Sequence, residues 1–171
     1  MKNKIPPPII TLFFGLCIYF SQSYFAEFNY DLLTILSYIF YLAGFSILVA
    51  AVSLFKKQNT TVNPIMIQNA SSLVTSGIFK YSRNPMYLGM ALILLGLSLM
   101  FNLIGGILFI LLFTVYIAKF QIKPEEEVME RLFGEDFLKY KQNVRMWLWI
   151  IGVYQWSNYW LILAERKGFE P

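Results

Sequence analysis

Long apolar runs dominate the pattern of hydrophobic and polar positions along this 171-residue chain. A helix needs roughly 20 apolar residues to cross a hydrocarbon core of about 30 Å, so uncharged runs near that length predict membrane-spanning helices. Four such runs occur, at Ile9–Phe25, Leu32–Phe55, Pro85–Phe101 and Leu103–Ala118. The pattern therefore predicts an all-α integral membrane protein with about four transmembrane helices.

The ends of these runs also carry information. Only Asn102 separates the last two runs, which predicts a tight antiparallel hairpin, and Gly105 and Gly106 allow its helices to approach closely. Lys2 and Lys4 before the first run also fit the start of a secretory signal peptide. No small-residue cleavage site precedes a polar mature domain, so we expect the first run to be a retained transmembrane helix.

Beyond the fourth run, residues 121–145 read as one amphipathic helix on the cytoplasmic side. Its apolar positions are spaced 4, 3, 4 and 3 residues apart, which puts them on one helical face: Phe133, Phe137, Tyr140, Val144 and Trp147. Gly134 weakens a helix by about 1 kcal/mol relative to alanine and marks a candidate break. We expect this helix to lie along the membrane surface and to close over the mouth of the hairpin.

Three regions follow from this pattern. Residues 1–58 hold the first two transmembrane helices, and residues 59–148 hold a candidate cofactor-binding region with the last two. Residues 149–171 form a Trp-rich tail, for which an interfacial segment and an extension without function remain equally open.

Composition supports a membrane location. Apolar residues make up 57% of the chain and charged residues 14%, whereas a soluble domain usually carries about a quarter charged residues. With four spans and a cytoplasmic N-terminus, all 14 Lys and Arg residues fall on the cytoplasmic side. We therefore expect a bacterial inner-membrane protein with both termini in the cytoplasm. The net charge of +4 is then a topology signal and an affinity for anionic membrane lipid, not evidence for nucleic acid as a partner.

Two absences narrow the candidate chemistry. The single cysteine, Cys17, lies inside an apolar run and is read as a small buried hydrophobe, which excludes a disulfide framework. The chain has no histidine, so neither an imidazole base nor a histidine-bound metal is expected, and no metal site is predicted.

The polar residues collect in two segments, 56–84 and 121–145, that flank the hairpin and should meet at its mouth. Each has an ordinary interpretation: Asn84-Pro85 starts a helix, and Glu125, Glu126 and Glu127 complement the dipole at a solvated helix end. Together they gather five polar side chains at one membrane face, where a polar ligand can meet a lipid-soluble one: Arg83, Asn84, Tyr87, Glu125 and Glu126.

Two stretches carry a family resemblance. Residues 73–79 read LVTSGIF, residues 82–89 read SRNPMYLG, and Glu125-Glu126 is followed by Met129, Phe133-Gly134, Phe137 and Tyr140. In order and spacing, this combination resembles the isoprenylcysteine carboxyl methyltransferase family, which is related to the phospholipid methyltransferases. The resemblance covers residues 59–148. It implies a helical membrane enzyme that uses S-adenosyl-L-methionine, at a site open to the cytoplasm, on a lipid-soluble or membrane-presented substrate.

Carried over position by position, the resemblance assigns ten cofactor contacts: Ser71, Ser72, Leu73, Val74, Phe79, Asn84, Pro85, Met86, Tyr87 and Glu125. Glutamate accepts from ribose hydroxyls or an ammonium group, and an aromatic ring packs on adenine. An acidic and aromatic pocket also favours the cationic sulfonium.

The chain departs from the family pattern at two positions. Asn84 stands where the family commonly has histidine, and it forms hydrogen bonds without changing charge. Gln121 stands four residues before the acidic pair, where an arginine of the eukaryotic enzymes engages the substrate carboxylate. Glutamine carries no charge to pair with a carboxylate, which weakens the case for prenylcysteine. The candidate substrate contacts are Gln121, Arg83 as its substitute, and Glu126, and no catalytic residue is assigned.

Two alternatives remain open at this point. Membrane sterol reductases share a similar C-terminal architecture and use NADPH, although the 2′-phosphate of NADPH needs clustered Arg or Lys and only Arg83 is suitably located. A non-catalytic four-helix membrane scaffold explains the hydrophobicity but leaves the matched motifs unexplained.

Overall fold

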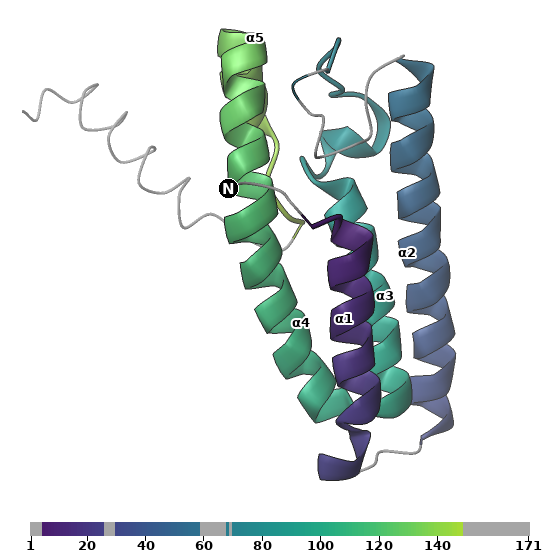
Figure 1. Cartoon of the computed structure of the whole chain (residues 1–171). Coiled ribbons are helices and arrows are strands. Elements are labelled where there is room, and N and C mark those ends of the chain that lie inside the picture. Colours follow the sequence, from purple (N-terminus) through teal and green to yellow (C-terminus); the bar gives the residue numbers. More distant parts are fainter. Residues whose placement is uncertain (1–4, 26–29, 59–67, 69, 149–171) are drawn as a thin grey trace, which may run out of the picture.

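The structure is a computed structural model that describes residues 5–25, 30–58, 68 and 70–148. Every regular element in these residues is helical (Figure 1). The α-helices are α1 (Pro7–Phe20), α2 (Asp31–Lys57), α3 (Pro85–Phe101), α4 (Leu103–Ile117) and α5 (Lys123–Asn143). Two short 3-10 turns, η1 (Gln22–Tyr24) and η3 (Gly77–Lys80), and one π-helical turn, η4 (Ala118–Ile122), complete the list. The predicted tail, residues 149–171, lies outside the described residues.

The predicted all-α class is confirmed, and the four apolar runs coincide with α1 to α4. The first predicted run extends to Phe25, but α1 ends at Phe20, because the chain turns into η1 there. Helix α2 and the joined helix Leu103–Asn143 are long and apolar enough to cross a membrane, by length and composition. Helices α1 and α3 are apolar but shorter, with 14 and 17 residues. This architecture is consistent with a membrane protein.

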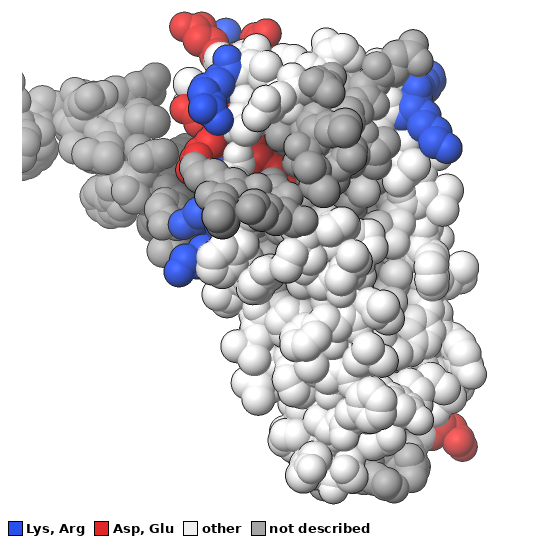
Figure 2. Space-filling view, viewed as in Figure 1, with Lys and Arg blue, Asp and Glu red and all other residues white. Residues whose placement is uncertain are grey.

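Helix α3 is the centre of the bundle. It packs against α2, α1 and α4, and nine of its 17 residues are buried. The core contains Leu94 of α3 itself together with apolar residues of its neighbours, among them Ile18 of α1 and Phe113 of α4. Figure 2 shows charged side chains gathered at one end of the visible face, whereas the long body below is almost free of charge.

Helices α2 and α3 approach each other through small residues. The three buried residues of α2 recur every seventh position, at Ser37, Gly44 and Ala51. A Cβ added at Gly44 would lie 2.7 Å from the backbone oxygen of Gly89, and one added at Gly89 would lie 2.8 Å from that of Gly44. Since both obstructing atoms belong to backbone, neither can move aside as a side chain would. These two glycines therefore set the distance between the helices.

The tight hairpin predicted between α3 and α4 is confirmed, with Asn102 as its link. Asn102 is buried, its Oδ1 accepts from the Gly105 amide at 2.9 Å, and its Nδ2 donates to Ser21 Oγ at 3.0 Å. Asn102 therefore caps α4 and holds the end of α1 at the same point. Gly106 packs directly on Ser98, so close approach at this hairpin depends on a residue without a side chain.

The expected single amphipathic helix is wrong, because Gly134 divides α5. Gly134 has φ 51° and ψ −125°, outside the helical region. Lys141 Nζ lies 3.3 Å from Glu126 Oε2, although 15 residues of straight helix would separate them by roughly 22 Å. The second part of α5 therefore folds back beside the first. The candidate break at Gly134 is thus confirmed, and the first part of α5 extends α4 (Figure 1).

The five apolar positions assigned to one helical face are buried or half-buried, but they do not share a face. Phe133, Phe137, Tyr140 and Val144 pack in a cluster with Val74 and Phe79, whereas Trp147 belongs to the core around α3. The difference arises because the helix breaks at Gly134 and ends at Asn143, and Val144 is extended.

We predict that Gly44→Ala destabilises the protein by about 1–3 kcal/mol, because the new methyl group meets the Gly89 carbonyl. The unfolding temperature in detergent measures the effect, with the folded fraction after each heating step determined by size-exclusion chromatography. Ser46→Ala is the matched control, since Ser46 is exposed on the same helix. Equal unfolding temperatures for the two variants would mean that the helices have room to separate.

Candidate functional site

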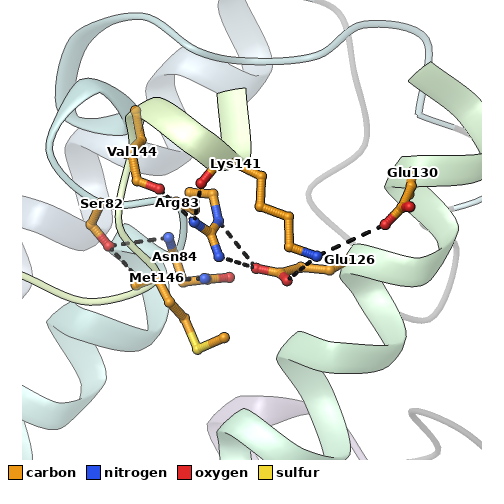
Figure 3. Close-up of polar contacts among 8 residues, drawn as sticks. All are labelled: Ser82, Arg83, Asn84, Glu126, Glu130, Lys141, Val144 and Met146. Atoms are coloured by element: carbon orange, nitrogen blue, oxygen red, sulfur yellow. Dashed lines mark hydrogen bonds and ion pairs between the residues drawn. The ribbon is translucent and has the colours of Figure 1, made fainter. Parts of the chain in front are cut away.

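Four segments meet where α3 begins: the loop before α3, the first turn of α3, the start of α5 and the segment 144–147 (Figure 3). The loop reaches this point because η3 follows Gly77, whose φ of 59° suits glycine. Pro85 then occupies the first helical turn, where its missing N–H costs no hydrogen bond. The sequence prediction that the two polar segments meet at the mouth of the hairpin is confirmed.

Arg83 is the most heavily bonded side chain of this region. Its Nε and Nη2 donate to Glu126 Oε1 at 3.1 and 2.7 Å, and its Nη1 donates to the carbonyls of Lys141, at 3.1 Å, and Val144. The side chains of Arg83 and Glu126 are only 10% and 11% exposed. The guanidinium therefore joins the loop before α3 to both parts of α5 through four of its five N–H groups.

The residues beside Arg83 hold the segment after α5. Ser82 Oγ and Asn84 Nδ2 both donate to the Met146 carbonyl, at 3.1 and 3.3 Å, and the Arg83 amide donates to the Arg145 carbonyl at 2.8 Å. The Ser82-Arg83-Asn84 stretch thus fixes the course of the chain after α5. Asn84 does not cap α3 with its side chain, although the local sequence predicts this.

Glu126 also faces a second cation. Lys141 Nζ lies 3.3 Å from Glu126 and 3.8 Å from Glu130, so it bridges the two carboxylates (Figure 3). With Arg83 on one side and Lys141 on the other, the charge of Glu126 is compensated within the protein.

Glu125, the other member of the acidic pair, has a different environment. Its Oε1 accepts from the Tyr87 hydroxyl at 2.5 Å, and its Oε2 has no partner among the described residues. The pKa of the Glu125 carboxyl is raised from 4.5 to about 7: burial raises it most, the hydrogen bond from Tyr87 lowers it, and the charge of Glu126 raises it by a smaller amount. Glu125 is therefore a half-buried carboxylate without a cationic partner.

The remaining predicted cofactor contacts lie on or beside this junction. Ser71 is exposed, Ser72 donates to Gln58, and Leu73, Val74, Phe79 and Met86 pack in the apolar cluster with Phe137 and Tyr140. Tyr140 donates to the Phe79 carbonyl at 2.7 Å, and burial raises the pKa of its hydroxyl above the ordinary value. Gln121 lies one turn before Glu125, buried in η4, and donates through Nε2 to the Ile5 carbonyl at 2.9 Å.

Lys141 and the carbonyls of Val144 and Met146 were not identified from the sequence. Backbone carbonyls carry no residue signature, so the partners of Ser82, Arg83 and Asn84 become visible only with the fold. The turn at Gly134 brings Lys141 near the acidic pair, so this glycine is the sequence signal from which Lys141 could have been found.

Comparison with known proteins assigns the family. A sequence model described as phospholipid methyltransferase matches residues 32–136, well over half of the chain. The chain belongs to the phospholipid methyltransferase family. The match includes α2 to α4, the Arg83 loop and the acidic pair, so the resemblance to isoprenylcysteine carboxyl methyltransferases is confirmed at family level. Family membership supports methyl transfer as the class of reaction.

Two similar proteins cover parts of the chain. An uncharacterized protein of Haemophilus influenzae is 41% identical over 63 residues, which is 37% of this chain and all of that protein. The Protein-S-isoprenylcysteine O-methyltransferase of Schizosaccharomyces pombe is 35% identical over 75 residues, which is 42% of this chain and 30% of the yeast protein. The chain thus aligns with less than a third of the yeast enzyme, and no solved structure matches it significantly.

We predict that Arg83→Met destabilises the protein by about 3–5 kcal/mol, because buried Glu126 keeps only Lys141 as a partner and two carbonyls lose their donor. Unfolding by denaturant in detergent measures this. Glu135→Gln is the control and should cost under about 0.5 kcal/mol, because it breaks only the exposed pair with Lys139. A double variant Arg83→Met/Glu126→Met should lose less than the sum of its single variants, and strict additivity would contradict the coupling.

Proposed function

We propose that this chain is an integral membrane methyltransferase that uses S-adenosyl-L-methionine and acts on a lipid-soluble acceptor. Family membership supports the reaction class. The single observation that carries the choice of cofactor is the state of the acidic pair: Glu126 is neutralised by Arg83 and Lys141, and Glu125 is not.

The chemistry of the donor set fits this cofactor. S-adenosyl-L-methionine, when bound, supplies a methyl group on a positively charged sulfonium and also carries an ammonium group. The free oxygen of Glu125 can accept a hydrogen bond from an ammonium or ribose hydroxyl, and its charge favours a cation. The Tyr87 hydroxyl fixes the other carboxylate oxygen, so the carboxylate is oriented before a ligand arrives. Phe79 and Met86 belong to an apolar cluster near the same end of the bundle, which would limit the access of water to a bound ligand.

The same charge argues against an anionic cofactor. NADPH carries phosphates, which need free arginine or lysine side chains. Arg83 is occupied by Glu126 and two carbonyls, and Lys141 bridges two carboxylates. Neither of these two side chains is therefore available to bind the phosphates of a nicotinamide cofactor.

For the topology we propose four spans, α1 to α4, with the charged end of the bundle in the cytoplasm of a bacterial cell. The basic residues at the ends of the helices support this orientation, since Lys56 and Lys57 end α2 and Lys119 and Lys123 follow α4. The opposite end contains Tyr24 and Tyr30, exposed aromatic side chains suited to a membrane interface.

Binding experiments test the cofactor assignment. We expect Glu125→Gln to weaken S-adenosyl-L-methionine binding about ten- to a hundredfold, the cost of one charge-assisted hydrogen bond, and Tyr87→Phe to weaken it less. Isothermal titration calorimetry on detergent-purified protein measures both, with Asp136→Asn, an exposed acid on α5, as the control. Tighter binding of NADPH than of S-adenosyl-L-methionine by the unmodified chain would refute the assignment.

Cofactor affinity should also depend on pH. Because the Glu125 pKa lies near 7, the carboxyl is neutral below that pH and ionised above it. A bound cation favours the ionised form, so affinity should rise about tenfold per pH unit below pH 7 and level off above about pH 8. The free energy of unfolding should change in the opposite direction. Because the pKa of Glu125 is higher in the folded protein than in the unfolded chain, its contribution to stability is fully present below about pH 4.5 and is lost as the pH rises through about 7. In Glu125→Gln, the dependence of cofactor affinity on pH should largely disappear. An unchanged dependence would mean that a group other than Glu125 titrates.

Cysteine labelling tests the proposed topology. In a Cys17→Ala background, we expect a membrane-impermeant maleimide to label Ser23→Cys on intact cells, because Ser23 follows α1 at the outer end. Gln142→Cys, exposed near the end of α5, should react only after the membrane is opened. The reverse pattern would invert the orientation, and labelling of both sites on intact cells would contradict four spans.

A further inference from the structure

Gln121 is a buried polar side chain whose hydrogen bonding is incomplete. It is 2% exposed and lies in η4, the π-helical turn between α4 and α5. Its Nε2 donates to the Ile5 carbonyl at 2.9 Å, whereas its Oε1 is buried and has no hydrogen-bond partner among the described residues. Buried amide oxygens are rarely left unpaired, so this atom calls for an explanation.

The orientation of this amide follows from its partner. If the two ends of the amide were exchanged, the Gln121 oxygen would lie 2.9 Å from the carbonyl oxygen of Ile5, and two acceptors would face each other. The free atom is therefore the acceptor, not the donor. Only a group that carries an N–H or O–H can satisfy it.

Gln121 also lies on the inward side of the helix that carries Glu125. Gln121 and Ile122 are buried, Glu125 is half-buried and Glu126 is buried, whereas Lys119, Phe120, Lys123 and Glu127 are exposed. Residues four apart on a helix lie on the same face, so Gln121 lies one turn below Glu125, on the apolar side of the proposed cofactor site. Ile122 beside it packs in the core with Tyr87, the partner of Glu125.

Among the described residues, no cation contacts Gln121. Lys119 and Lys123 are the nearest cations in the sequence, and both are exposed on the other side of the helix. The guanidinium of Arg83 donates four hydrogen bonds, to Glu126 and to the carbonyls of Lys141 and Val144. A carboxylate beside Gln121 would meet an acceptor oxygen, and no cation of the described residues contacts this position to compensate for its lost hydration.

We propose that Gln121 is a specificity-determining residue whose free amide oxygen accepts a hydrogen bond from the methyl acceptor. The acceptor is then a lipid-soluble compound with a neutral N–H or O–H group near its reacting end, and not a carboxylate. This inference rests on the proposed function, since it names the substrate class of the same site. It also gives the unpaired oxygen a role: the site is incomplete until a ligand supplies the donor.

A matched pair of ligands tests the inference. N-acetyl-S-farnesylcysteine and its primary carboxamide share one apolar tail, but the first presents a carboxylate and the second an N–H donor. Their dissociation constants are measured by equilibrium dialysis with radiolabelled ligand on the detergent-purified full chain. We expect the carboxamide to bind at least about fivefold more tightly, the contribution of one hydrogen bond.

Substitutions then attribute the preference to Gln121. Gln121→Met keeps an unbranched side chain of similar volume without the acceptor and should abolish the preference, whereas Gln121→Arg should reverse it. Gln142→Met, at an exposed glutamine, should retain it. A purely structural role, through the hydrogen bond to Ile5, would lower the unfolding temperature of Gln121→Met without changing the ratio of the two dissociation constants.

Each outcome decides the inference. Equal or tighter binding of the acid by the unmodified chain overturns it, and so does an unchanged ratio in Gln121→Met. If neither Gln121 variant folds, the preference of the unmodified chain and of Gln142→Met alone decides. S-adenosyl-L-methionine binding is measured on the same samples: its absence with a preserved carboxamide preference refutes the proposed function, whereas its presence without that preference refutes only the role of Gln121.

Discussion

A buried guanidinium must have its charge neutralised and its N–H groups bonded, and at Arg83 this requirement organises the whole charged end of the protein. Glu126 supplies the charge, and the carbonyls of Lys141 and Val144 supply the remaining acceptors. These partners come from both parts of α5 and from the chain after it. The fold-back at Gly134 and the loop before α3 are therefore held by one side chain.

The same interaction gives two adjacent glutamates different roles. Neighbouring residues on a helix point about 100° apart, so only one of them can face Arg83. Glu126 does so and is neutralised, while Glu125 faces Tyr87 and has no cationic partner among the described residues. A solvated helix end, the ordinary interpretation of three consecutive glutamates, does not produce this asymmetry. It arises because Arg83 pairs with Glu126, and the turn at Gly134 brings Lys141 to the same carboxylate.

Much of the fold follows from the sequence, because apolar run length and glycine positions act locally. The uncharged runs predict α1 to α4, and Asn102 with two glycines predicts the hairpin. The meeting of the two polar segments follows from that hairpin. The sequence does not predict the reversal within α5, since the apolar spacing of 4 and 3 continues through Gly134 as if the helix were straight. Those apolar residues are still buried, because Phe137 and Tyr140 meet the loop around Phe79 after the chain has reversed.

For the site, sequence comparison identifies the residues that gather, but not their partners. Arg83 and Glu126 are candidate substrate contacts by sequence, yet the structure pairs them with each other, whereas Glu125 and Gln121 each keep one side-chain oxygen without a partner among the described residues. Both of these side chains lie on the inner face of one continuous helix, from η4 into α5. The first offers a charged acceptor beside the polar end of the bundle, and the second offers a neutral acceptor one turn deeper. The proposed methyl donor is cationic and the proposed methyl acceptor is largely apolar. Polarity therefore falls from donor to acceptor as it falls from Glu125 to Gln121, and this gradient along one helix face is suited to bringing the two together.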